Sequence, residues 1–168
     1  PYLCNYEGQG IFFDCDQMLR TDIAEIFSVM EEQPGKAVHV VKHTYEPRDD
    51  VKYLNTVQYK YPRKNWSSVI LWNCNSFPNR KLTPEFVQRS TGAELHRFSW
   101  IEDERIGELP PEWNWLDVEY EWNPLAKLVH YTLGTPCFHE FATSGDFAEE
   151  WHQERLLTDH CEQRTTNE

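Results

Sequence analysis

Basic side chains are the first thing this sequence has little of. Its 168 residues carry 16 Lys and Arg against 28 Asp and Glu, a net charge of −12 at pH 7. A protein that binds nucleic acid usually presents a basic surface to the phosphate backbone, so we expect no nucleic-acid partner. The acidic excess is uneven, because residues 140–168 hold eight Asp and Glu but two Arg.

Cysteine pairs and long apolar segments are also missing. The five cysteines are an odd number and no two follow Cys-x-x-Cys spacing, so neither a disulfide framework nor a zinc knuckle is indicated. No apolar run approaches the roughly 18 residues of a membrane-spanning helix, and no basic and apolar leader opens the chain. We therefore expect a reducing compartment, a cytoplasmic location and no membrane span.

Aromatic side chains, in contrast, are abundant, with seven Trp, eight Tyr and nine Phe. Such rings either build a core or stack on planar or sugar ligands, and both uses are open here. Trp113 and Trp115 stand two apart, so in an extended segment they face the same side. They are predicted either to form the floor of a sugar site or to pack in the core.

Strands and helices alternate in the sequence pattern, within a length that suits one core. Thr21-Asp22 is predicted to cap an amphipathic helix that ends at Pro34-Gly35, and Thr83-Pro84 to open another. The other predicted elements are strands at 10–13, 37–41, 69–72 and 127–131, a short helix that ends near Leu109, and an acidic helix from Phe147. We expect an α/β fold with a mixed, mainly parallel sheet and flanking helices.

The most informative stretch runs from Gly10 to Asp16. Three apolar residues at 11–13 predict a strand buried on both faces, and the strand stops at Asp14-Cys15-Asp16. In an extended backbone Asp14 and Asp16 point the same way, so they can share a hard divalent cation or a phosphate bound to it. The alternative is a polar turn in which the two acids only cap the following segment.

Other candidates lie where predicted strands end, which is where ligands sit in α/β sheets. Lys42 and His43 follow one such strand, and His130 ends another. Gly134 would let the backbone approach a bound group closely. The alternatives are solvated charges at Lys42 and His43 and a structural strand-end histidine at His130.

The order of these parts resembles a known family. The chain has an apolar strand with Asp14-Cys15-Asp16 first, then Asn65-Trp66-Ser67, then Glu102-Asp103, and last a His130-to-Pro136 segment of pattern His-Tyr-Thr-x-Gly-x-Pro. From about Pro1 to Phe138 it is similar to metal-dependent nucleotide-sugar glycosyltransferases of the GT-A fold, most closely to small bacterial and phage-type members. The resemblance implies a reduced, Rossmann-like GT-A catalytic domain at 1–140 and an acidic C-terminal helix and tail at 141–168.

The resemblance also implies roles for individual residues. Asp14 and Asp16 would form the DxD motif that holds Mn²⁺ or Mg²⁺ against the donor diphosphate, with His130 as the third protein ligand. Asn65 and Ser67 would contact the donor sugar. Glu102 and Asp103 would lie on the acceptor side, and if the reaction inverts the anomeric centre, Asp103 is the first choice of base and Glu102 the second. The alternative for residues 102–104 is the acidic first turn of a helix.

The sequence departs from the family pattern at two points. A GT-A domain has a nucleotide-binding half before its DxD motif, whereas here the motif begins at residue 14. The base pocket is therefore expected to be absent, minimal or supplied from elsewhere. Cys137 also stands where the family pattern leads us to expect a tryptophan.

Three functions follow as hypotheses. The first is a glycosyltransferase that moves a hexose, with UDP-glucose as the first donor, to a glycan, lipid or protein acceptor, or hydrolyses the donor slowly. The second is a phosphatase of the haloacid dehalogenase type, which also begins with an apolar strand and DxD, although Met18 stands where that family usually has Thr or Val. The third is a non-catalytic domain that binds sugar or protein. Self-association is left open.

Overall fold

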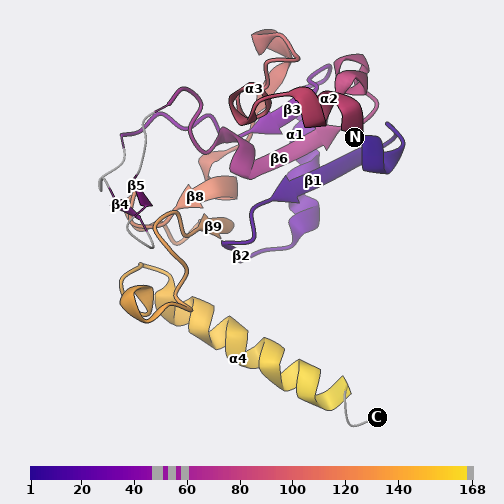
Figure 1. Cartoon of the computed structure of the whole chain (residues 1–168). Helices are drawn as coiled ribbons and strands as arrows, with labels where there is room; N and C mark the ends of the chain where they lie inside the picture. Colours follow the sequence, from indigo (N-terminus) through magenta and orange to yellow (C-terminus); the bar gives the residue numbers. More distant parts are fainter. Residues whose placement is uncertain (47–50, 53–55, 58–60, 166–168) are drawn as a thin grey trace.

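Two mixed sheets form the centre of the molecule (Figure 1). A computed structural model describes residues 1–46, 51–52, 56–57 and 61–165. The first sheet has the order β1 (Gln9–Phe13), β6 (Val69–Asn73), β3 (Val38–Val40) and β7 (Ile106–Glu108). The second has the order β2 (Gln17–Leu19), β9 (Leu128–His130) and β8 (Trp115–Leu116), and a two-stranded sheet joins β4 (Val51–Lys52) to β5 (Thr56–Val57).

The sheets are not mainly parallel, so this part of the predicted fold class is wrong. Among the described residues, β3 pairs with β7 and β8 pairs with β9 in the parallel sense, whereas the other strand pairs are antiparallel. Apolar patterning identifies a strand but carries no information about its direction relative to a distant partner. The prediction of a mixed α/β fold is confirmed.

The helices are short apart from the last one. They are η2 (Ile23–Phe27), α1 (Ser28–Glu32), α2 (Pro84–Arg89), α3 (Gly92–His96) and α4 (Ala148–Thr165), with further 3₁₀ turns at Tyr2–Cys4, Trp66–Ser68, Phe77–Lys81, Asp103–Arg105, Pro111–Asn114 and His139–Phe141. Two predicted caps are confirmed, because Asp22 accepts a hydrogen bond from the backbone N–H of Ala24 and Thr83 accepts one from that of Phe86. Among the described residues, no helix is both long enough and apolar enough to cross a lipid bilayer.

Strand β6 is the spine of the core because both of its faces are covered. Val69 and Leu71 pack with Ile26 and other residues of η2 and α1 on one face. Ile70 packs on the other face with Phe98 and the residues around α2 and α3. Burial of each such side chain contributes about 1.5–3 kcal/mol, so the alternation along β6 stabilises helices on both sides of the first sheet.

Strand β1 differs from its prediction in burial. It lies at the edge of the first sheet and, within the described part of the chain, pairs only with β6, where Phe12 lies opposite Ile70. Phe12 and Phe13 are 47% and 40% exposed, so the strand is not buried on both faces. An edge strand can be as apolar as a central one, which is why composition alone led to the wrong prediction.

The prediction of a short helix that ends near Leu109 is wrong beyond the first turn of that helix. One 3₁₀ turn at Asp103–Arg105 leads directly into strand β7. Gly107 lies opposite His39 in the parallel pair of β7 with β3, and the buried imidazole of His39 fills the space beside it. This close packing needs a residue without a side chain, and glycine also disfavours a helix.

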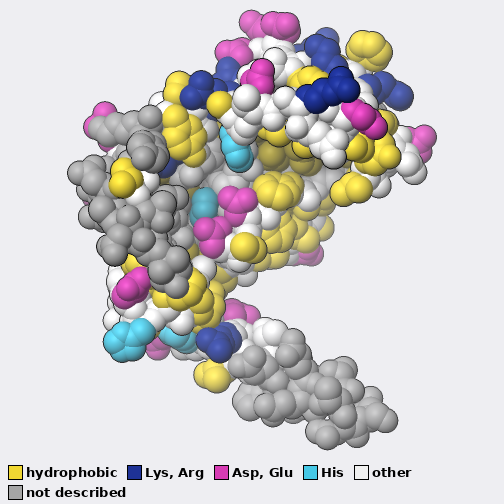
Figure 2. Space-filling model, viewed as in Figure 1, with side chains coloured by type: hydrophobic (Ala, Val, Ile, Leu, Met, Phe, Trp, Pro, Cys, Tyr) yellow, Lys and Arg dark blue, Asp and Glu magenta, His cyan; other side chains and the backbone are white. Residues whose placement is uncertain are grey.

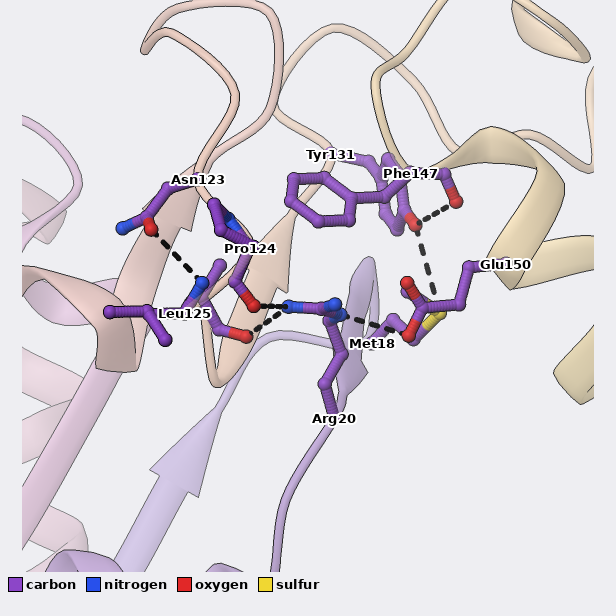
Figure 3. Close-up of polar contacts among 9 residues, drawn as sticks. Met18, Arg20, Asn123, Pro124, Leu125, Tyr131, Phe147 and Glu150 are labelled. Atoms are coloured by element: carbon purple, nitrogen blue, oxygen red, sulfur yellow. Dashed lines mark hydrogen bonds and ion pairs between the residues drawn. The ribbon is translucent and has the colours of Figure 1, made fainter.

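The acidic C-terminal helix is confirmed as α4, and one arginine anchors its start. Arg20 Nε donates to Glu150 Oε1 at 2.9 Å and its guanidinium also donates to the carbonyl oxygen of Pro124 (Figure 3). Close by, the Tyr131 hydroxyl donates to the carbonyl oxygen of Phe147 at 3.2 Å. Beyond this anchor α4 projects away from both sheets (Figure 1).

A buried carboxyl group fixes the turn before α4. Asp117 is 4% exposed, accepts a hydrogen bond from the backbone N–H of Asp146, and leaves no space for a side chain at Gly145. Burial raises the pKa of Asp117 to about 6, above the ordinary value of about 3.9 that it has in the unfolded chain. Its contribution to stability is therefore full below about pH 4 and is lost as the pH rises through about 6.

Replacement of Gly107 by Ala should destabilise the fold by about 1–3 kcal/mol, because the new Cβ would lie 2.3 Å from Cδ2 of His39. Urea unfolding measures the change. Gly92→Ala is the control, since a Cβ at Gly92 would have its nearest neighbour at 3.8 Å in a helix. Equal stability of the two variants would contradict the packing described for β7.

Replacement of Asp117 by Asn should change how stability depends on pH. Asn cannot ionise, so the free energy of unfolding of the variant relative to the parent should rise by about 1–3 kcal/mol between pH 4 and pH 7. Urea unfolding across this range provides the measurement. A difference that stays constant with pH would show that Asp117 ionises as an ordinary carboxyl group.

Candidate metal centre

Three predicted ligands meet where the two sheets adjoin. Asp14 follows β1, Asp16 precedes β2, and His130 ends β9. One donor atom from each lies within 4.8 Å of the others, and Nε2 of His130 is 3.5 Å from Oδ1 of Asp16. On the face shown in Figure 2, acidic and histidine side chains gather near the middle of the molecule. These residues could hold a metal ion.

Backbone hydrogen bonds fix the segment that carries both aspartates. The N–H of Asp14 donates to the carbonyl oxygen of Ser68, which precedes β6, at 3.0 Å. The N–H of Tyr131 donates to the carbonyl oxygen of Asp16 at 3.0 Å, and Gln17 lies opposite His130 in the antiparallel pair. Each sheet thus holds one end of the Asp14–Asp16 segment, so the carboxylates are positioned by the fold.

Asn114 fixes the orientation of His130 from behind. It is fully buried, and its Nδ2 donates to the carbonyl oxygen of Asn65 at 3.1 Å and to Oγ of Ser68 at 2.8 Å. Its Oδ1 is therefore the atom that faces Nδ1 of His130, at 3.2 Å. Because an amide oxygen only accepts, Nδ1 of His130 carries the proton.

The chemical consequence lies at the other ring nitrogen. Nε2 of His130 is therefore the ring nitrogen that faces the carboxylate of Asp16. In the neutral ring with its proton on Nδ1, this nitrogen carries the lone pair that can bind a cation. Two carboxylates and one imidazole nitrogen form a donor set that suits Mn²⁺, Mg²⁺ or a related divalent ion, and the nitrogen favours Mn²⁺. The residues therefore fit the expected metal.

A second network joins this centre to the strand end after β3. Nδ1 of His43 is 2.7 Å from the hydroxyl of Tyr120, and burial, with a smaller effect of the nearby His130, lowers the pKa of His43 to about 3. His43 is thus neutral at physiological pH. The Asn65 side chain donates to the hydroxyl of Tyr45, whose ring contacts those of His43 and Tyr120.

The predicted donor-sugar residues have other contacts in this structure. Asn65 adopts a left-handed backbone conformation with φ of 61°, which asparagine tolerates, and its carbonyl oxygen supports Asn114. Oγ of Ser67 is 2.7 Å from Nδ1 of His96. At Gly134 a Cβ would lie 2.5 Å from the ring of Phe141, so a side chain of this protein fills that space. Their roles toward a donor stay predictions.

Glu102 and Asp103 lie at the exposed start of the turn before β7. The Asp103 side chain is 75% exposed and forms an ion pair with Arg63, whose guanidinium lies over the ring of Trp66. Glu102 is exposed and begins the same turn. Both observations agree with the alternative of an acidic first turn, and the proposed acceptor-side role is untested.

Two functional features were not found by sequence reasoning. Asn114 stands between Trp113 and Trp115 without a motif of its own, and nothing in its separation of 16 residues from His130 indicates that the two side chains touch. The second feature is an open cleft lined by Lys42, His43 and Trp115. Trp113, by contrast, is a core residue and does not form the floor of a site.

Replacement of Asn114 by Ala should weaken Mn²⁺ binding about 10- to 100-fold, because His130 loses the partner that fixes its orientation and tautomer. Isothermal titration calorimetry with MnCl₂ measures the affinity. The control is Asn75→Ala, an exposed asparagine beyond the opposite end of β6. Unchanged affinity in a folded Asn114 variant would contradict the positioning role.

Comparison with known proteins identifies a similar sequence and a similar structure. No protein-family model matches the chain. Protein CDI of Arabidopsis thaliana is 42% identical over 159 residues, which cover 92% of this chain and 60% of that protein. The chain therefore spans about 60% of the length of this relative. The crystal structure of mouse xyloside xylosyltransferase 1 in its apo form is similar with a TM-score of 0.49 and 17% identity, over 76% of this chain and 59% of that one.

Proposed function

We propose that this protein is a metal-dependent glycosyltransferase. It would move a hexose from a nucleotide diphosphate sugar, with UDP-glucose as the first donor to test, to an acceptor hydroxyl. The observation that carries the proposal is the meeting of Asp14, Asp16 and His130 with their donor atoms within 4.8 Å. The DxD spacing and the terminal histidine that suggested the family in sequence thus lie at one place.

The role of the three ligands follows from charge. Without a cation, the carboxylates of Asp14 and Asp16 would repel a diphosphate. Two like charges about 4 Å apart repel each other by about 1 kcal/mol in water and by about 4 kcal/mol near a protein surface. With a divalent cation between them, the carboxylates become a diphosphate site. When bound, that ion neutralises the charge that develops on the leaving diphosphate, without a proton donor.

The remaining residues would position the metal ligands and take the proton from the acceptor hydroxyl. Asn114 holds His130 with its Nε2 toward Asp16, so the donor atoms that would hold the metal are in place before the sugar donor arrives. If the reaction inverts the anomeric centre, a carboxylate takes the proton of the acceptor hydroxyl, and we assign this role first to Asp103 and second to Glu102. If configuration is retained, neither residue needs to act as a base, and one of them could bind the acceptor.

Replacement of Asp16 by Asn should reduce Mn²⁺-dependent release of UDP from UDP-glucose by roughly 100-fold, the size of effect seen when one electrostatic contact to a transition state is lost. A coupled assay for UDP, with and without MnCl₂, gives the rate. Asp22→Asn is a matched control, because it removes the same charge from a helix cap that asparagine also serves.

Three outcomes would contradict the proposal. An unchanged rate in Asp16→Asn would remove the metal assignment. Turnover of p-nitrophenyl phosphate that depends on Asp14 would instead support a phosphatase of the haloacid dehalogenase type. Calorimetry that shows no binding of UDP-glucose to the folded protein, with or without Mn²⁺, would support a non-catalytic binding domain.

A further inference from the structure

An open cleft of about 760 Å³ lies at the C-terminal end of β3. Its volume is in the range of small-molecule sites in proteins. Its lining comes from the segment after β3, from the end of β7 and the residues that follow it, and from Trp115 of β8 with residues 119–123. The lining residues that matter here are Lys42, His43, Glu108, Trp115, Glu119, Tyr120, Glu121 and Trp122.

Aromatic rings form the wall after β8. Trp115 and Tyr120 pack edge to face with centroids 5.1 Å apart, and the Tyr120 hydroxyl contacts His43 at 2.7 Å, so both rings are held in place. Trp122 is 59% exposed although it lines the cleft. A large exposed ring beside fixed ones is a suitable platform for a flat apolar surface of a ligand.

The charge of the cleft restricts that ligand. Three carboxylates, at Glu108, Glu119 and Glu121, line it with one lysine, Lys42. Burial and the charge of Glu119 together raise the pKa of Tyr120, so a negative charge acts on the aromatic wall itself. A diphosphate would be repelled here. A neutral ligand with many hydroxyl groups would not be, and carboxylates accept hydrogen bonds from hydroxyls.

His43 supports the aromatic wall from behind, through one of its two ring nitrogens. His43 is 7% exposed, and its Nε2 has no hydrogen-bond partner among the described residues of the chain. This nitrogen has almost no accessible surface, so it lies behind the wall of the cleft and is not itself a contact for a ligand. The other nitrogen of the same ring is already taken by Tyr120.

The cleft adjoins the metal centre through two elements. Trp115 pairs with Val129 in the parallel β8–β9 pair, one residue before His130. Trp115 also follows Asn114 directly, and Asn114 holds His130 from behind. The rings that line the cleft and the residues that fix the metal ligand therefore belong to the same short segments.

We propose that this cleft binds the acceptor and that the acceptor is a neutral saccharide. Glu102 and Asp103 do not line the cleft, so this inference replaces the acceptor-side roles assigned to them above. The C–H face of a sugar ring would lie against Trp122 and Trp115, and its hydroxyls would meet the exposed carboxylates of Glu108 and Glu121. The role of the saccharide as an acceptor rests on the proposed function. The binding of a saccharide in the cleft does not, because it needs neither the metal nor a nucleotide sugar. The assignment selects one of the three acceptor classes, glycan, lipid and protein, that the sequence left open.

The test is a titration of the metal-free protein, in EDTA, with cellobiose and with the methyl glycosides of glucose, galactose and mannose. Tryptophan fluorescence and saturation-transfer NMR follow binding. We expect saturable binding of at least one saccharide, weakened about three- to tenfold in Trp122→Ala, as the loss of one aromatic contact implies. Leu125→Ala is the matched control, because Leu125 is 71% exposed nearby and does not line the cleft.

Each result decides the inference separately from the proposed function. No saccharide binding, or binding that is equally strong in Trp122→Ala, overturns the cleft assignment even if the parent protein releases UDP from UDP-glucose. Displacement of the bound saccharide by UMP also overturns it, because the cleft would then hold the nucleotide. Saccharide binding that Trp122→Ala weakens supports the cleft assignment, and a failed UDP assay would then contradict only the proposed function.

Discussion

The hydrogen bond between Asn114 and His130 is the interaction on which the site depends. Because the Asn114 amide donates to Asn65 and Ser68, its oxygen must face the imidazole, and the proton of His130 stays on the buried side. Nε2 is then the ring nitrogen that faces Asp16. Because the fold holds both side chains, their donor atoms are positioned to bind a cation together with Asp14.

The fold serves this arrangement by joining two small sheets at one segment. Asp14 is tied to the first sheet through Ser68, and Asp16 is tied to the second through Tyr131. The core on both faces of β6 makes the first sheet rigid, and Arg20 anchors the start of α4 beside the second. Trp115 of the cleft follows Asn114 directly in the chain, and Asn114 contacts His130. The candidate metal and saccharide sites therefore share a supporting segment.

Local patterns predicted local features well. The caps at Asp22 and Thr83, the strand β6 and the strand ending at His130 depend on neighbouring residues, and all are confirmed. The predictions of a mainly parallel sheet, of a β1 buried on both faces and of a helix at 106–108 were wrong. Each of these features depends on partners that are distant in the sequence. For β7 the decisive contact is Gly107 against His39, about 70 residues earlier in the chain.

The site shows the same division. Asp14, Asp16 and His130 could be named from motifs that a family resemblance supplied, whereas Asn114 and the carboxylates of the cleft carry no motif. The most direct test of the account is anomalous diffraction from crystals soaked in MnCl₂. We predict one strong manganese peak coordinated by Asp14, Asp16 and Nε2 of His130, and a map without a peak at these residues under saturating Mn²⁺ would contradict the account.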